Sequence, residues 1–230
     1  MTKKLNISVN KKIIIAIPKG RILEELKPIL KKVNIVPESS FHVSNNRKLM
    51  FNTSDKNIII IIVRSFDVVN FVAFGGAHLG VVGSDVIKEF SLDEIYAPVN
   101  LGIGKCRMSV AEPIKLAAKD NPNSWSHVRV ATKYPKITKN YFAERGVQAE
   151  CLKLNGSLEI APMLGLTKRI VDLVSTGQTL EDNGLSEIEK IMDISSFLIV
   201  NKNFSKSKPE SIKKIINRFR KAANVKSRKL

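Results

Sequence analysis

Blocks of apolar and polar residues along the chain predict strands that alternate with helices. Five consecutive apolar residues at 13–17 and six at 58–63 are typical of strands buried on both faces. A shorter apolar run at 79–83 predicts a third strand. Between the first two runs, apolar residues recur at helical spacing from Ile22 to Val33. This alternation predicts an α/β fold with largely parallel sheets.

The second half of the chain repeats the same rhythm. The pattern predicts strands at 106–111, 128–131, 149–154 and 170–174, helices at 84–90 and 136–144, one or two strands within 188–201, short strand-like pieces around 41 and 49–51, and a last helix through Ile212 and Phe219. This number of strands is high for one sheet. We therefore expect two lobes with a cleft between them. Lobe I would comprise 1–104 and 186–230, with the basic chain ends, and lobe II would comprise 105–185.

Composition and charge narrow the class of protein. The 230 residues are 43% hydrophobic and 26% charged, which are ordinary globular values and argue against disorder, collagen and a membrane bundle. The net charge of +17 is concentrated in residues 1–12 and 202–230. The favoured interpretation is a pair of solvated basic ends. A nucleic-acid-binding arm is the alternative, although Phe204 and Phe219 are the only aromatic residues in these ends.

Several kinds of site find no support in the sequence. Cys106 and Cys151 have no CxxC partner and the three histidines are scattered, so neither a zinc site nor a hydrolytic triad is expected. The apolar run at 13–17 is too short for the core of a signal peptide or for a membrane span. We therefore expect a cytoplasmic protein with reduced thiols and no membrane partner.

The segment 170–180 has the features of a phosphate-binding turn. A buried strand ends and Ser175-Thr176-Gly177-Gln178-Thr179 opens a helix, which offers hydroxyl groups and backbone N–H groups to an anion. Gly177 allows the backbone to approach the anion closely. Asp172, just before the turn, could accept hydrogen bonds from the hydroxyls of a ribose. The alternative is an ordinary capped turn without a ligand.

Basic residues follow two of the predicted strands. Lys19-Gly20-Arg21 comes directly after the first strand, and Arg64 comes after the strand at 58–63. In open α/β sheets, ligands bind beyond the carboxyl ends of the strands. These cations are therefore candidates for binding a diphosphate or triphosphate. Taken singly, each would be an ordinary surface cation.

Six blocks in order give the chain a resemblance to the ATP phosphoribosyltransferase family. The blocks are residues 18–21, 64–68, 79–85, 101–107, 156–162 and 172–180. The resemblance implies transfer of the phosphoribosyl group from phosphoribosyl diphosphate to N1 of ATP, the first step of histidine biosynthesis. It also implies two α/β lobes like those of a type II periplasmic binding protein, with the active site in the cleft. A non-catalytic small-molecule-binding protein of the same fold is the alternative.

The resemblance also implies roles for particular residues. The turn Ser175 to Thr179 would hold the 5′-phosphate, and Glu159 and Asp172 would hold the ribose hydroxyls. Lys19, Gly20, Arg21 and Arg64 would bind ATP, and the three cations among them would also act on the departing pyrophosphate. Magnesium would be bound mainly by the substrate phosphates, without a set of protein ligands.

The resemblance further implies an assembly. The chain is similar to the short form of the family, which works with a regulatory subunit resembling histidyl-tRNA synthetase and forms a homodimer within a hetero-octamer. The chain departs from the family pattern at two positions, where His78 and Lys168 replace acidic residues. If either acid orients a substrate loop, the affinity or the rate would suffer.

Overall fold

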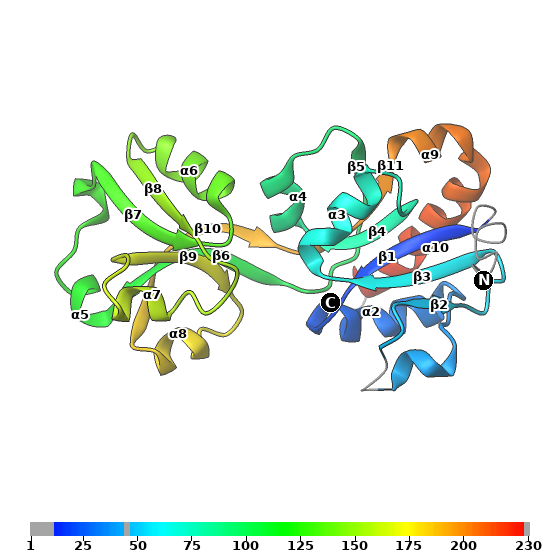
Figure 1. Cartoon of the computed structure of the whole chain (residues 1–230), viewed down its shortest axis with the longest axis horizontal. Helices are drawn as coiled ribbons and strands as arrows, with labels where there is room; N and C mark the ends of the chain where they lie inside the picture. The colour runs from blue at the N-terminus through cyan, green and yellow to red at the C-terminus, as the bar shows by residue number, and fades with distance from the viewer. Residues whose placement is uncertain (1–11, 44–46, 228–230) are drawn as a thin grey trace, which may run out of the picture. The chain divides into compact units, whose positions relative to one another are not determined.

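The computed structural model describes residues 12–43 and 47–227, and the chain divides into two compact units (Figure 1). The first unit comprises Met1–Ile87, Ser91–Gly104 and Ser195–Leu230, and the second comprises Lys88–Phe90 and Lys105–Ile194. The basic N-terminal stretch lies outside the described residues except for Lys12. Each unit has its own sheet with helices packed against it.

The sheet of the first unit has parallel strands at its centre and antiparallel strands toward its edges. Its strands are β1 (Ile13–Pro18), β2 (Met50–Asn52), β3 (Ile58–Val63), β4 (Leu79–Gly83), β5 (Ile95–Asn100) and β11 (Ser196–Asn201), in the order β2-β3-β1-β4-β11-β5. Strands β3, β1 and β4 run parallel, whereas β2 and β11 run antiparallel to their neighbours. The sheet is therefore mixed, and less parallel than the strand–helix alternation predicted.

Helices cover both faces of this sheet. They are α2 (Arg21–Lys32), α3 (Ser65–Ala73), α4 (Ser84–Phe90), α9 (Lys202–Ser207) and α10 (Pro209–Ser227), and a 3₁₀ helix spans Ser39–His42. Apolar residues of α2 and α10, such as Leu26 and Phe219, share one buried cluster with Ile15 of β1. The strand-like piece expected around Phe41 is the 3₁₀ helix, and Phe41 packs edge-on against Phe51 at 5.1 Å between centroids.

Helix α3 covers the opposite face and approaches β4 closely at Gly80. A Cβ at position 80 would lie 2.7 Å from Val68 Cγ1 and 2.9 Å from Val72 Cγ2. These separations are shorter than van der Waals contact, so only glycine lets α3 pack at this depth. The carbonyl oxygen of Ala16 lies 3.3 Å from the same point, so the neighbouring strand β1 also limits the space at position 80.

The second unit is a smaller α/β layer with a mixed sheet. Its strands are β6 (Cys106–Pro113), β7 (His127–Thr132), β8 (Gln148–Lys153), β9 (Arg169–Val174) and β10 (Leu185–Ile194), in the order β10-β6-β9-β7-β8. Strands β9, β7 and β8 are parallel, and β6 is antiparallel to both β9 and β10. Its helices are α5 (Ile114–Ala117), α6 (Pro135–Ala143), α7 (Ile160–Met163) and α8 (Gln178–Asp182), with a 3₁₀ helix at Pro122–Ser124.

The boundary between the units differs from the expected one on the return path of the chain. Residues 186–194, which we expected in lobe I, belong to strand β10 and pair with β6 from Leu185 opposite Pro113 to Ile194 opposite Cys106. A single residue, Ser195, separates β10 from β11. Because no glycine or proline lies between the two strands, the sequence contains no turn signal at the point where the chain changes sheets.

A buried polar cluster lies beneath the sheet surface of the second unit. Arg169 is 6% exposed, and its Nε lies 2.9 Å from Oε2 of the fully buried Glu112. The same guanidinium pairs with Asp120 and lies over the ring of Trp125, 4.0 Å from its centroid. Burial raises the pKa of Glu112 to about 7. The sequence patterns predicted none of these contacts, because Glu112 and Arg169 lie on different strands and the other two residues lie in a loop.

The helices are too short or too polar to span a bilayer. Over residues 12–43 and 47–227, none is long and apolar enough to cross a membrane.

Candidate active site

The ends of β1 and β3 place two of the predicted cations side by side in the first unit. Pro18 pairs with Val63 in parallel register, and the N–H of Lys19 donates to the carbonyl oxygen of Val63 at 3.2 Å. Lys19 therefore follows β1 at the point where Arg64 follows β3. Both residues are exposed. The carboxyl end of this sheet thus presents two cationic side chains from neighbouring strands.

Gly20 and Arg21 form the connection from β1 into α2. Gly20 has φ of 87°, a conformation that favours glycine, and Arg21 is the first residue of the helix. Arg21 Nε lies 3.7 Å from Glu25 Oε1, and the other oxygen of Glu25 accepts the N–H of Gly104 at 2.8 Å. Glu25 therefore balances part of the Arg21 charge and also ties α2 to the glycine-rich block at 101–107.

In the second unit, the predicted phosphate-binding turn follows β9 as expected. Gly177 has φ of 98° and its carbonyl oxygen accepts the N–H groups of Leu180 and Glu181 at 3.0 and 3.1 Å. Thr176 Oγ1 accepts the N–H of Gln178 at 3.3 Å. Most of the turn is exposed, with Gly177 partly covered. Because α8 has only five residues, its dipole is small, and local N–H and hydroxyl groups supply the binding capacity of the turn.

Asp172 lies on β9 shortly before this turn, and Glu159 directly precedes α7. Asp172 is half-buried, its Oδ1 accepts its neighbour's N–H from Leu173 at 2.7 Å, and burial raises its pKa to about 6. The Glu159 carboxylate adds a smaller contribution to that rise in pKa. Leu158 is buried in the same cluster as Ile170, so the packing of this leucine holds Glu159 beside β9.

Lys133 is a neighbour of this pair that the sequence patterns did not single out. It follows β7, which lies parallel to β9 with Thr132 opposite Val171. Its charge acts to lower the pKa of Asp172, against the larger effect of burial. The signal was available, because Lys133 follows a buried strand just as Lys19 and Arg64 do.

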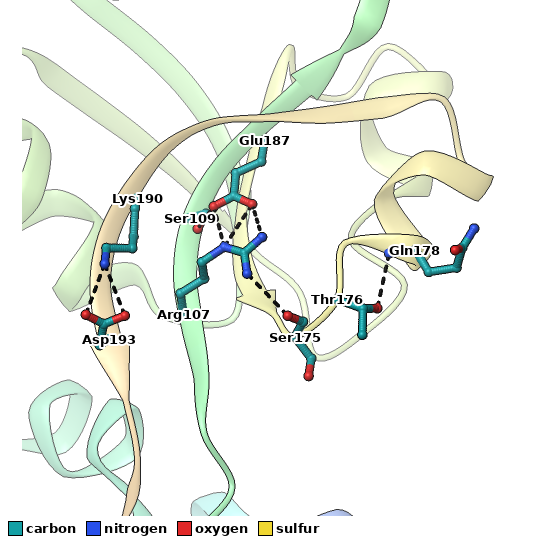
Figure 2. A network of polar contacts seen from close by, with 8 residues as sticks. All are labelled: Arg107, Ser109, Ser175, Thr176, Gln178, Glu187, Lys190 and Asp193. Atoms are coloured by element: carbon teal, nitrogen blue, oxygen red, sulfur yellow. Dashed lines mark hydrogen bonds and ion pairs between the residues drawn. The ribbon is translucent and has the colours of Figure 1, made fainter. Parts of the chain in front are cut away.

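Arg107 is the last residue of the block at 101–107, but no role was predicted for it. It lies on β6 and its side chain extends toward the turn, where Nη1 donates to the carbonyl oxygen of Ser175 at 3.2 Å (Figure 2). Glu187 on β10 accepts from Arg107 Nε at 2.7 and 2.9 Å. These three residues are remote in sequence, so only the strand order β10-β6-β9 reveals the network.

The two departures from the family pattern lie at the other ends of the strands. His78 directly precedes β4, and Lys168 directly precedes β9. Lys19 and Arg64 follow the carboxyl ends of the parallel strands β1 and β3, and the predicted phosphate-binding turn follows β9. Each departure is therefore at the amino end of a strand, whereas the candidate site residues follow carboxyl ends.

Two mixed α/β units of this kind define the two-lobe architecture of type II periplasmic binding proteins. The periplasmic aliphatic sulphonate binding protein SsuA from Escherichia coli matches the fold with a TM-score of 0.57 at 12% identity, over 95% of this chain and 70% of that one. The ATP phosphoribosyl transferase (HisG:HisZ) complex from Thermotoga maritima matches with a TM-score of 0.77 at 29% identity, over 92% of this chain and 98% of that one.

Sequence comparison narrows the class to one family. The family model HisG, ATP phosphoribosyltransferase, matches residues 64–221. The ATP phosphoribosyltransferase of Paramagnetospirillum magneticum is 57% identical over 216 residues, which cover 94% of this chain and 99% of the relative. The chain belongs to the ATP phosphoribosyltransferase family.

Proposed function

We propose that Asp172, Glu159 and the turn from Ser175 to Thr179 bind phosphoribosyl diphosphate in the family reaction. That reaction transfers phosphoribosyl to N1 of ATP and releases pyrophosphate, the first step of histidine biosynthesis, so the enzyme is a pentosyl-transferring glycosyltransferase. The observation that supports the assignment is the half-buried carboxyl group of Asp172 at the end of β9, shortly before an exposed turn with a left-handed glycine, Gly177.

The reaction depends mainly on how the two substrates are positioned relative to each other. The lone pair of adenine N1 forms a bond to C1 of the ribose, while the bond from C1 to the diphosphate oxygen breaks and its electron pair leaves with pyrophosphate. The configuration at C1 inverts and the ribose gains oxocarbenium character. Carboxylates that hold the ribose hydroxyls, and a turn that holds the 5′-phosphate, fix C1 relative to the nucleophile. No covalent nucleophile on the protein is required.

The cations of the first unit would bind negatively charged phosphate groups of the substrates. Lys19 and Arg64 lie on neighbouring strand ends and are exposed, which suits them to the departing pyrophosphate or to the phosphates of ATP. Gly20 lets the backbone approach those phosphates. Arg21 would also bind these phosphates. Because it pairs with Glu25, its contribution to phosphate binding would be the smallest of the three cations.

Magnesium is proposed as the metal cofactor. In the part of the chain that the structure describes, no group of three or more His, Cys, Asp or Glu residues could hold a metal ion. Proteins bind Mg²⁺ through one or two carboxylates together with substrate phosphates. We therefore propose that most ligands of the ion would be substrate oxygens. When bound, the ion would neutralise charge on the leaving diphosphate.

The assembly and the location are proposed from the family resemblance. We propose that the chain acts as the short-form catalytic subunit with a regulatory subunit similar to histidyl-tRNA synthetase, since the similar Thermotoga maritima protein is a complex of two components, HisG and HisZ. A homodimer within a hetero-octamer is the proposed stoichiometry, and light scattering of the mixed subunits would measure it. The cytoplasm is the proposed location, since ATP and phosphoribosyl diphosphate are used there.

A turnover assay tests the residue assignments. Purified protein would be mixed with ATP, phosphoribosyl diphosphate, Mg²⁺ and a pyrophosphatase, with and without the regulatory subunit, and phosphoribosyl-ATP followed by absorbance. Asp172→Ala, Thr176→Ala and Arg64→Ala should each lower turnover by about 100-fold or more while the chain stays folded.

Arg129→Ala is the matched control for these variants. Arg129 is an exposed arginine on β7 that pairs with Glu150 at 3.2 Å, so the variant should keep full turnover. Near-normal turnover in all three site variants would overturn the assignment. A folded wild-type protein that binds phosphoribosyl diphosphate without turnover would favour the non-catalytic binding protein instead.

A further inference from the structure

We propose that Arg107, held by Glu187, is a positioning residue for the phosphate-binding turn. The inference rests on the proposed function, because it concerns how the turn from Ser175 to Thr179 is presented to phosphoribosyl diphosphate. Figure 2 shows the Arg107 guanidinium between the Glu187 carboxylate on one side and the carbonyl oxygen of Ser175 on the other.

The contact with Ser175 sets the orientation of a peptide group in the turn. Arg107 Nη1 donates to the Ser175 carbonyl oxygen at 3.2 Å. The peptide bond that follows is trans, so its C=O and N–H point in opposite directions. With the carbonyl directed at Arg107, the N–H of Thr176 is directed to the opposite edge of the turn. That is the kind of donor a 5′-phosphate needs from a cradle of backbone N–H groups.

The charge of Arg107 is already balanced within the protein. Nε donates to both Glu187 oxygens, at 2.7 and 2.9 Å, and Nη2 donates to one of them at 2.5 Å. This bonding raises the pKa of Arg107 and lowers the pKa of Glu187, so both groups stay ionised. A guanidinium held in this way acts on the turn through geometry and serves less well as a counter-charge for substrate.

Glu187 is itself fixed by a second donor. Ser109, on the same strand as Arg107, donates through Oγ to Glu187 Oε1 at 2.7 Å. The carboxylate therefore bridges β10 and β6, and Arg107 continues the bridge to the end of β9. The pair Lys190–Asp193 further along β10 is exposed and makes no contact with the turn in Figure 2, which separates the positioning network from ordinary surface pairing.

The test measures affinity for phosphoribosyl diphosphate by titration calorimetry, together with separate KM values for the two substrates. Arg107→Gln should raise the Kd for phosphoribosyl diphosphate about tenfold, a change of about 1.4 kcal/mol, and leave the KM for ATP within about twofold. Arg107→Lys should behave similarly, because lysine keeps the charge but lacks the planar fork. Glu187→Gln should raise the Kd by about threefold.

A variant on β10, the strand that carries Glu187, provides the control. Glu189 on β10 pairs with Arg145 and accepts from Tyr141 at 2.7 Å, but it does not reach the turn. Glu189→Gln should leave the Kd for phosphoribosyl diphosphate unchanged. The double variant Arg107→Gln/Glu187→Gln should be no weaker than Arg107→Gln alone, since Glu187 acts through the arginine.

The outcomes separate this inference from the proposed function. Unchanged affinity in Arg107→Gln, or full recovery in Arg107→Lys, overturns the positioning role while the assignment of the turn stands. A wild-type protein that neither binds nor turns over phosphoribosyl diphosphate overturns the proposed function instead. If Arg107→Gln does not fold, Arg107→Lys and Glu187→Gln decide the question by the same measurements.

Discussion

The imidazole ring of His78 stacks on the ring of Phe204, with the centroids 4.0 Å apart and the planes inclined by 26°. His78 Nδ1 accepts the N–H of Ile14 at 3.2 Å, and Nε2 lies 3.2 Å from Lys208 Nζ. Because Nδ1 is the acceptor, the proton of the neutral ring is on Nε2, facing a cation. His78 therefore links the starts of β1 and β4 to the C-terminal helices as an uncharged ring.

Protonation of His78 should destabilise the first unit. Burial, with a smaller effect of Lys208, lowers its pKa to about 4 from an ordinary value of 6.5. The stability it contributes is complete above pH 6.5 and is lost as the pH falls from about 6.5 to 4. The loss should be about 1–2 kcal/mol, discounted from the full linkage value for solvent screening.

Urea unfolding at several pH values would measure that loss. His78→Asn removes the titrating ring, so the difference in unfolding free energy between wild type and variant should shrink toward about pH 4. A constant difference between about pH 7.5 and 4 would contradict the assignment. Turnover at mildly alkaline pH should be close to normal in the variant, because position 78 is at the amino end of its strand.

Binding of phosphoribosyl diphosphate should weaken below about pH 6 through Asp172. Burial raises the pKa of this carboxyl to about 6, and only the ionised form accepts hydrogen bonds from both ribose hydroxyls. The KM for phosphoribosyl diphosphate should rise by about tenfold per pH unit below this pKa from this group alone. Asp172→Asn should have a high KM without this component.

Substrate ionisation is shared by both proteins and cancels in the comparison of their pH profiles. The raised pKa of Asp172 also affects folding, because a carboxyl group with a raised pKa lowers the unfolding free energy as the pH rises from about 4 to 6. Asp172→Asn should therefore be slightly more stable than wild type at neutral pH. Parallel KM profiles in the two proteins would exclude Asp172 as the titrating group.

Removing the buried cation of the second unit should be strongly destabilising. Arg169→Met leaves the buried carboxyl of Glu112 and that of Asp120 without their partner, which typically costs about 3–5 kcal/mol. Urea unfolding would measure the loss. Arg129→Met breaks an exposed pair and should cost less than about 1 kcal/mol. Equal losses in the two variants would show that burial is not decisive here.

A methyl group at position 80 should separate α3 from the sheet. Gly80→Ala places a carbon 2.7 Å from Val68 Cγ1, and relief of this overlap should cost about 1–3 kcal/mol in the unfolding free energy. Gly156→Ala is the control, because nothing lies within 4 Å of a Cβ at that position. If both variants unfold at the same urea concentration as the wild type, helix α3 does not pack on β4 as closely as in the structure.

Much of the fold was predictable because its signals are local. The buried strands at 13–17 and 58–63, and the helix after Pro18, were predicted nearly to the residue. Strand β5 was missed because Pro98 lies within it, and proline argues against a central strand. In the structure β5 is at the edge of the sheet, where a missing N–H donor is tolerated. Edge position depends on strand order, which the local sequence does not contain.

The candidate site also has a part that was predictable from local sequence and a part that was not. The turn at 175–179, with Asp172 before it, is one continuous motif and was found from its own residues. The roles of Arg107 and Glu187 depend on β10, β6 and β9 lying side by side, with Arg107 opposite Val174. Pairs between distant strands leave no periodic signal in a single sequence. Their discovery therefore required the three-dimensional structure.

The pairing of Cys106 with Ile194 gives the second unit the character of an insertion. The chain enters at Lys105 and leaves at Ile194, and these ends meet as neighbours on β6 and β10. In the first unit, Ser196 donates its N–H to the Ile103 carbonyl oxygen at 2.9 Å, so a short linker could rejoin that chain. Apart from Lys88–Phe90, the second unit is thus one continuous segment, and expressing residues 105–194 alone would separate the predicted phosphate-binding turn from the cations that follow β1 and β3.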